Sequence, residues 1–333
     1  MDKNTFLAII LSVVVISLGF VIQTTYFMPE EYVTTVSENT AKQTGEEVEQ
    51  TNNQAVVLES TEEALDTVEF ELGDENYISR TIEVETDKFI VTFNTEGAII
   101  ESLKLREHMK GLHPVDMIQT GDTDLGSFGI SLGDNTDAYL KEAYDYKHSS
   151  GTDEYSFIRN YKVKLVNGSF SDPFQIKKTF VFFPDEYMFE VRVELVNSEN
   201  SAIPLNYNGM AYTLFAGPQI GPEFQKLDGR NEFRKYYSLS GDKREVHKLK
   251  NGSDESADQI KWAAIVGKYF TMIGIPGSGT SNIIWSNTPR DGLAETSEMI
   301  FERAATKRSN IKDVYRFYIG PKNDSNLAKY NMA

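Results

Sequence analysis

The chain has 333 residues, and its 50 Asp and Glu against 33 Lys and Arg give a formal net charge of -17, with no cysteine. This acidity argues against nucleic-acid binding, which needs clustered basic residues to neutralise phosphates. The lack of cysteine excludes a disulfide framework, a zinc site with thiolate ligands and a cysteine nucleophile.

A long apolar segment near the N-terminus predicts a membrane anchor. Residues Phe6–Ile22 carry no charge, and a weakly polar continuation to Phe27 gives the roughly 20 residues that span a bilayer. We predict a transmembrane signal anchor over 6–27. The alternative is a cleaved secretory signal, which should show a basic start, a shorter apolar run and small residues at the cleavage site. The sequence shows none of these features clearly, so we favour the anchor.

The charges beside this segment predict its orientation. Lys3 and the terminal amine precede it, whereas the acidic Glu30 and Glu31 follow it, so the positive side is N-terminal. We therefore expect residues 1–5 to lie in the cytoplasm. Everything after the anchor is then on the outer side of the membrane, which is the periplasm in a diderm bacterium.

The next stretch has the composition of a disordered linker. Between Pro29 and Tyr77 the sequence has 14 acidic residues and a single basic one, Lys42. Such a segment cannot bury enough apolar surface to offset the entropy lost on folding. We predict an acidic disordered linker over 28–77. The remaining residues hold 32 basic and 36 acidic side chains, so most of the net charge belongs to this linker.

From residue 78 onward the hydrophobic pattern is that of β-strands. Ile82–Glu85 alternates apolar with acidic residues, and Phe89–Phe93 places three large apolar side chains on one face, which indicates a β-meander that continues to Leu105. Pro184–Glu186 is typical of a tight turn that joins two strands in a hairpin. Further strands are expected over 157–166, 175–183, 187–196, 259–275 with breaks, 282–285, 298–303 and 313–319.

So many strands and so little helix predict a mainly β fold, a large antiparallel sandwich. We expect long irregular loops in two stretches: 116–137, which is rich in Gly and Asp, and 217–252, which has two Gly-Pro pairs and a basic segment. The last expected element is a short C-terminal helix, because Asn323 and Asp324 can cap the residues that follow.

Motifs that carry catalytic or metal chemistry are weak in this sequence. Asp122–Gly126 lacks the further ligands of a calcium loop and is interpreted as a polar turn. Gly274–Thr280 lacks the lysine of a phosphate-binding loop, so we expect a hairpin connection between apolar strands. His108 and His113 could belong to a metal site, but a solvated turn after Leu105 is favoured. We therefore assign no catalytic residue, no cofactor-binding residue and no metal ligand.

Several ordered motifs resemble a known family. They are the segment Glu85–Gly97, the hairpin from Lys178 to Asn197, Trp262 with Tyr269 seven residues later, and Phe317–Lys322 with Leu327 beyond. In order and spacing along about 300 residues they resemble the YidC/Oxa/Alb family of membrane protein insertases. The resemblance covers that family's first membrane span and first periplasmic domain.

The resemblance implies an antiparallel β-supersandwich in the periplasm over 78–322, with 323–333 as the start of a helix that leads to a membrane core. That core is absent from this sequence, so we interpret the chain as a fragment or a truncated product. The implied function is non-enzymatic assistance, with no cofactor, to the insertion and folding of proteins in the bacterial inner membrane. The implied partners are Sec translocon subunits and nascent membrane proteins, besides the lipid bilayer around 6–27.

Two further hypotheses remain open. A membrane-anchored carbohydrate-binding or sugar-modifying β-sandwich would use aromatic side chains to stack on sugars, although Trp262 lies in a strand pattern that favours core packing. A partner-binding patch is suggested by basic residues in an otherwise acidic chain, against the alternative of a solvated loop. The residues of this patch are Arg230, Arg234, Lys235, Lys243, Arg244, Lys248 and Lys250.

Overall fold

The computed structural model of the chain describes residues 67–73, 76–118, 126–136, 139–197, 199–217, 230, 233–249, 251–256, 259–289 and 295–332. The predicted anchor over 6–27 lies outside the described residues, as does the linker up to residue 66. No helix within the described ranges has the length and apolar character needed to cross a membrane. Residues 61–333 form one compact unit.

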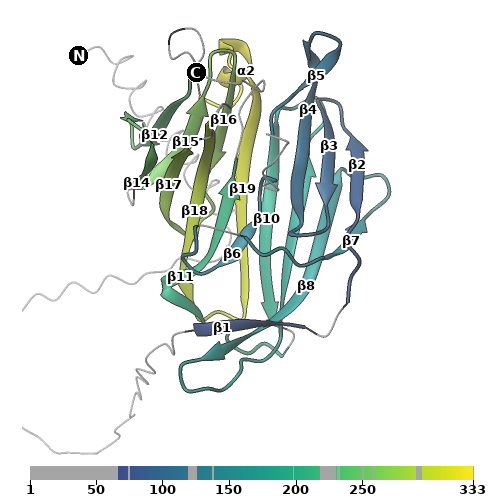
Figure 1. Ribbon diagram of the computed structural model, residues 1–333, viewed down its shortest axis with the longest axis vertical. Helices are drawn as coiled ribbons and strands as arrows, with labels where there is room; N and C mark the ends of the chain where they lie inside the picture. Colours follow the sequence, from purple (N-terminus) through teal and green to yellow (C-terminus); the bar gives the residue numbers. More distant parts are fainter. Residues whose placement is uncertain are drawn as a thin grey trace, which may run out of the picture. The chain divides into compact units, whose positions relative to one another are not determined.

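The described part of the chain is built almost entirely of antiparallel strands, as predicted (Figure 1). A short helix, α2, follows the last strand and covers Asp324–Ala328. The strands are β1 (Thr67–Leu72), β2 (Thr81–Glu85), β3 (Phe89–Asn94), β4 (Ile99–Lys110), β5 (His113–Asp116), β6 (Ile130–Leu132), β7 (Asp145–His148), β8 (Glu154–Leu165), β9 (Phe174–Phe182), β10 (Met188–Asn197), β11 (Leu205–Ala216), β12 (Lys235–Ser240), β13 (Lys243–His247), β14 (Gly252–Ser256), β15 (Ile260–Val266), β16 (Phe270–Ile275), β17 (Thr280–Thr288), β18 (Thr296–Thr306) and β19 (Asn310–Pro321).

These strands form three sheets. A 10-stranded sheet has the order β1-β8-β9-β10-β19-β16-β15-β12-β13, with β7 added to β8. A 5-stranded sheet has the order β14-β17-β18-β11-β6, and a 4-stranded sheet has the order β2-β3-β4-β5. The large sheet mixes strands from both ends of the described chain, because β19 returns between β10 and β16. The C-terminal strand therefore holds the two halves of this sheet together.

Aromatic contacts show that both smaller sheets cover the same face of the large one. The Phe93 ring of β3 lies 5.1 Å from that of Phe180 on β9 and 5.4 Å from that of Phe157 on β8. The Phe301 ring of β18 lies 5.6 Å from that of Phe317 on β19. Offset and edge-on aromatic pairs add stability beyond their buried area. The result is a sandwich whose second layer is divided between two sheets.

A buried lysine lies where the three sheets meet. Lys178 of β9 is 1% exposed, and its Nζ donates hydrogen bonds to the carbonyl oxygens of Gly97 (3.1 Å) and Phe128 (2.5 Å). Burial lowers the pKa of this amine well below its usual value, since a charged ammonium loses its hydration there. The Phe128 ring itself packs against Phe189 and Phe317. Lys178 therefore ties loop backbone to the large sheet inside the core.

Several expected elements are confirmed. β2, β3 and β4 form the predicted meander, and β9 pairs with β10 through the predicted turn. Asp185 adopts φ +56 in that turn, a left-handed conformation that Asp tolerates better than most residues. The C-terminal helix is capped as expected, because the Asn323 side chain accepts a hydrogen bond from the Asn326 N–H.

Other expectations were wrong. β1 lies inside the predicted linker 28–77 and pairs with β8, so residues 67–72 form a strand of the large sheet. β6 lies within the stretch 116–137 that was expected to be irregular. The stretch 217–252 contains the hairpin of β12 and β13 in place of an irregular loop. The segment 276–279 is not a hairpin connection, because β16 belongs to the 10-stranded sheet and β17 to the 5-stranded one.

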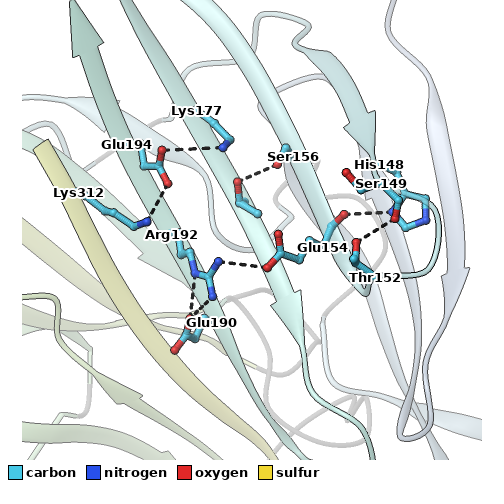
Figure 2. Close-up of polar contacts among 11 residues, drawn as sticks. His148, Ser149, Thr152, Glu154, Ser156, Lys177, Glu190, Arg192, Glu194 and Lys312 are labelled. Carbon is cyan, nitrogen blue, oxygen red and sulfur yellow. Dashed lines mark hydrogen bonds and ion pairs between the residues drawn. The ribbon is translucent and has the colours of Figure 1, made fainter. Parts of the chain in front are cut away.

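The outer face of the large sheet carries a group of ion pairs (Figure 2). Alternate side chains of β10 point away from the core, and there the Arg192 guanidinium lies 2.8 Å from Glu190 and 3.2 Å from Glu154. On the same strand, Glu194 lies 3.4 Å from Lys312 of β19. The pair of Glu194 with Lys312 joins neighbouring strands and supports their register, although exposed ion pairs contribute little stability each. We interpret this half of the face as a solvated sheet surface.

Candidate partner-binding surface

The predicted basic patch is placed mainly on one hairpin at the edge of the 10-stranded sheet. Lys235 opens β12, and Lys243 and Arg244 open β13, which is the edge strand. The two strands are joined at Gly241 and Asp242, and Gly241 adopts φ +58, which glycine accepts without strain. The many charged residues of this hairpin hide the alternation of buried and exposed side chains in its sequence.

The basic side chains of the hairpin have different surroundings. The Lys243 ammonium lies 2.6 Å from the Glu245 carboxylate, which lowers the pKa of that carboxyl group. The Arg244 guanidinium lies over the Tyr237 ring at 5.5 Å, and the Lys235 ammonium lies over the Phe233 ring at 5.0 Å. Such cation–π contacts hold the charged groups near aromatic surface. All three basic side chains remain exposed.

The other members of the predicted patch are not all equivalent. Lys248 is exposed just after β13, and Arg230 is exposed upstream of β12. Arg234 is half-buried, and burial lowers the pKa of its guanidinium. Lys250 lies outside the described residues. The structure thus brings Lys243, Arg244 and Lys248 together at one sheet edge, and it sets Arg234 apart.

A charged edge strand has two physical consequences. It blocks unwanted pairing with strands of other molecules, because charged residues are costly to bury in a new sheet. It also offers a positive surface to an acidic partner, with contacts that salt would screen. The geometry therefore allows the predicted partner-binding role without requiring it.

A hydrogen-bonded chain of Ser, His and Asp lies beside this edge, and no motif in the sequence indicated it. The Ser238 hydroxyl lies 2.9 Å from Nε2 of His247, and Nδ1 of His247 lies 2.9 Å from the Asp254 carboxylate. The His247 ring stacks on that of Trp285, with ring centroids 3.8 Å apart. Ser238 and His247 belong to the 10-stranded sheet, whereas Asp254 and Trp285 belong to the 5-stranded sheet.

This order of residues is that of a hydrolase triad, but the burial is different. A nucleophilic serine must reach its substrate and needs donors for the developing oxyanion. Ser238 is 1% exposed and lies between the two sheets. The arrangement is therefore suited to holding the edge hairpin on the smaller sheet. Sequence spacing could not reveal it, because Asp254 approaches His247 only through the packing of two sheets.

Histidine and carboxylate side chains are the described residues that could act as metal ligands. Within these ranges, no three His, Asp or Glu side chains gather in a way that could hold a metal ion. His108, which was expected in a solvated turn, lies on β4, and its Nε2 is 3.2 Å from the Tyr187 hydroxyl. His113 is exposed on β5. These two histidines lie on separate strands of one hairpin and face different surroundings.

Comparison with known proteins decides the family. A family model described as the YidC periplasmic domain matches residues 81–333. The chain belongs to the YidC family. The membrane protein insertase YidC of Treponema denticola is 29% identical over 343 residues, an alignment that covers 100% of this chain and 58% of the relative. The corresponding protein of Treponema pallidum is 28% identical over 376 residues, which covers 100% of this chain and 60% of the relative.

The chain thus spans about three fifths of the length of these YidC relatives. A galactose mutarotase-like protein from Lactobacillus casei has a similar fold, with a TM-score of 0.50, 10% identity and coverage of 72% of this chain and 100% of the other. At this identity the likeness concerns the fold alone. The family assignment to YidC favours the insertase interpretation over the sugar-related one.

Proposed function

We propose that this chain is the periplasmic portion of a membrane protein insertase that assists insertion and folding of inner-membrane proteins, alone or with the Sec translocon. The observation that carries the proposal is the alignment of the whole chain with two insertases of the YidC family. In this proposal residues 6–27 anchor the chain in the inner membrane, and residues 28–333 lie in the periplasm. The function involves no catalysis.

The end of the domain supports a role in positioning. β19 lies in the middle of the large sheet, and α2 follows it directly. Leu327 of α2 is 8% exposed, and the Tyr330 ring lies 5.7 Å from that of Tyr318 on β19. The chain therefore leaves the sandwich in a fixed direction. A membrane segment that followed α2 would be oriented by the whole β domain.

The basic edge supports a role in partner contact. Lys243 and Arg244 are exposed on the edge strand β13 of the large sheet, and Lys248 is exposed just after it. We propose that this edge, with Arg230, Lys235 and Lys250, faces an acidic surface of a translocon subunit, whereas the half-buried Arg234 supports the patch from within.

A gene fusion tests the proposed function. The 333 residues are joined to the remaining C-terminal part of the Treponema denticola relative, and the fusion is produced in a bacterium depleted of its own YidC. We expect growth and the insertion of a reporter membrane protein to recover. The 333 residues alone should not restore either, because one anchor and a periplasmic domain give a substrate helix no path from water into lipid.

A matched fusion controls for the fold. In it, residues 78–322 are replaced by the Lactobacillus casei mutarotase-like protein, which has the same fold and 10% identity. If this control restores insertion as well as the first fusion does, the surface of this domain has no specific part in insertion. If the first fusion fails while the relative itself succeeds, the proposed function is wrong.

A further inference from the structure

Large apolar side chains are exposed on three turns at one end of the sandwich. Met109 (55% exposed) and Leu112 (89%) lie at the β4–β5 turn, Tyr269 (62%) lies at the β15–β16 turn, and Phe183 (36%) lies at the β9–β10 turn. Single exposed apolar residues are common on soluble proteins, but a group of them indicates a contact surface. We call residues 109–112, 183–186 and 267–269 the α2-end turns.

Specific contacts hold these turns at the same end as helix α2. The Lys322 backbone N–H, just before α2, donates to the carbonyl oxygen of Tyr269 at 2.7 Å, and the Lys322 ammonium donates to that of Gly267 at 3.1 Å. The His108 ring of β4 lies 5.6 Å from that of Phe270. Figure 1 shows β5 and α2 at the same end of the sandwich, where β16 begins.

Side-chain contacts also join the β9–β10 turn to β4. Tyr187, which follows the β9–β10 turn, donates a hydrogen bond from its hydroxyl to Glu107 at 2.9 Å. Lys88 lies 2.7 Å from Asp185 and 2.9 Å from Glu107, so two of the acidic groups at this end are paired with a cation. This pairing raises the pKa of Lys88 and lowers those of both carboxyl groups. The exposed apolar side chains therefore lie on turns that are held in place by these contacts. The nearby carboxylates of Glu107 and Asp185 are partly neutralised by Lys88.

Two of the turns combine apolar side chains with lysine. Lys110 lies between Met109 and Leu112, and Lys268 lies with its ammonium 4.8 Å over the Tyr269 ring. Neither turn contains an acidic residue. Tyrosine and lysine are the residues that favour the boundary between lipid and water, where the ring meets the headgroups and the ammonium meets phosphate. Anionic lipids add an attraction of roughly fivefold in binding for each lysine near the surface.

The shape of this end favours lipid over a protein partner. Protein interfaces are built around a compact, well-packed core of aromatic and apolar groups. Leu112 and Tyr269 instead project from separate hairpin turns, and Leu112 is exposed over most of its surface. A bilayer surface is deformable and can accept several separate apolar projections at once.

We propose that the α2-end turns contact an anionic phospholipid surface, with Leu112, Met109 and Tyr269 at the level of the headgroups and Lys110 and Lys268 at the phosphates. The contact is distinct from the anchor predicted over 6–27. It goes beyond the proposed function, because it would hold the domain at a fixed height and tilt on the membrane whatever the client protein is.

The absence of cysteine allows a direct experiment. Leu112→Cys and Tyr269→Cys, each made in the full chain, are labelled with an environment-sensitive fluorophore and incorporated into phosphatidylcholine vesicles with or without phosphatidylglycerol. Val166→Cys is the matched control, since Val166 is 63% exposed after β8, at the opposite end of β9 from the β9–β10 turn. If Leu112→Cys does not fold, Met109→Cys replaces it.

With phosphatidylglycerol, the labels at positions 112 and 269 should shift to the blue and be quenched by a lipid that carries a quencher, whereas the label at 166 should show neither effect. Lys110→Glu with Lys268→Glu should reduce both effects, and the control pair Lys307→Glu with Arg308→Glu, in the turn between β18 and β19, should not. Emission at 112 and 269 that matches the control label would overturn the proposal. A blue shift without lipid quenching would also overturn it, because it would assign the turns to contact between copies of the chain.

Discussion

The Nε atom of Arg303 on β18 lies 3.0 Å from the Asp313 carboxylate on β19, and this ion pair joins the 5-stranded sheet to the 10-stranded sheet inside the core. The Arg303 side chain is 10% exposed and that of Asp313 is 2% exposed. The Tyr212 hydroxyl of β11 donates to the same carboxylate at 2.8 Å, and burial beside this charge raises the pKa of Tyr212 far above its usual value. The interior of this sandwich is thus held by polar contacts as well as by aromatic packing.

Removing one partner of this buried pair should be costly. Arg303→Ala leaves the Asp313 charge without its cation, and we expect the free energy of unfolding to fall by about 3–5 kcal/mol. The control is Arg316→Ala, because Arg316 pairs with Glu190 while its side chain is 57% exposed, and such pairs contribute about 0–1 kcal/mol. Urea unfolding of the full chain in mild detergent, followed by Trp fluorescence, measures both. Equal losses would contradict a structural role for the buried pair.

The Ser238–His247–Asp254 chain should behave as a clamp between sheets. His247→Phe keeps a ring on Trp285 but leaves the buried Ser238 hydroxyl without its partner, so the free energy of unfolding should fall by about 1–3 kcal/mol. Adding Ser238→Ala should return part of that loss, because the orphaned polar group is then gone. A double-mutant cycle in urea provides the measurement. Strictly additive effects would show that the two side chains do not depend on each other.

Lys178 should make stability depend on pH. Its pKa is lowered in the folded state, so between that pKa and the unfolded value of 10.5 the unfolded chain binds more protons than the folded one. The free energy of unfolding of the native chain should therefore rise with pH through this window, because folding no longer has to remove a proton from this amine once the unfolded chain also loses it. Lys178→Met lacks this group. The free energy of unfolding of the native chain should therefore rise relative to that of the variant from neutral to alkaline pH, and a constant difference would rule out a lowered pKa.

The basic edge should be sensitive to charge reversal. Lys243→Glu, Arg244→Glu and Lys248→Glu in one variant should weaken co-purification of translocon subunits, most strongly at low salt where electrostatic contacts are least screened. The control reverses three exposed lysines elsewhere, Lys147, Lys307 and Lys312. Recovery of the subunits that does not differ between the two variants would show that this edge is a guard against strand pairing and no more.

Prediction from sequence was accurate where local chemistry decides the structure. Period-two alternation located the strands from Phe89 onward, and Asn323 marked the start of α2, because a strand face and a helix cap each depend on neighbours in sequence. It failed at β11, where Asn208 and Gly209 at positive φ accompany an interrupted register, and at the charged hairpin of β12 and β13. A bulge shifts the alternation, and charges on an edge strand conceal it.

The partner-binding surface was also predicted only in part from the sequence. The basic residues were visible in the sequence, but only the fold shows that Lys243 and Arg244 share an edge strand while Arg234 is half-buried. The exposed tips of the α2-end turns could not be recognised, since Leu112 and Tyr269 are far apart in sequence and only the fold places their turns at the same end of the sandwich.

By itself, the sequence determined the mainly β class, the order of the strands that alternate cleanly, the closing helix and the family resemblance, because each of these depends on residue types and spacings along the chain. Only the tertiary structure decided that β19 lies between β10 and β16, that two smaller sheets share one face of the large sheet, and that His247 meets Asp254. These contacts form when the sheets pack together. They are stabilised by burying side chains that can be separated by any number of residues, so no local sequence pattern specifies them.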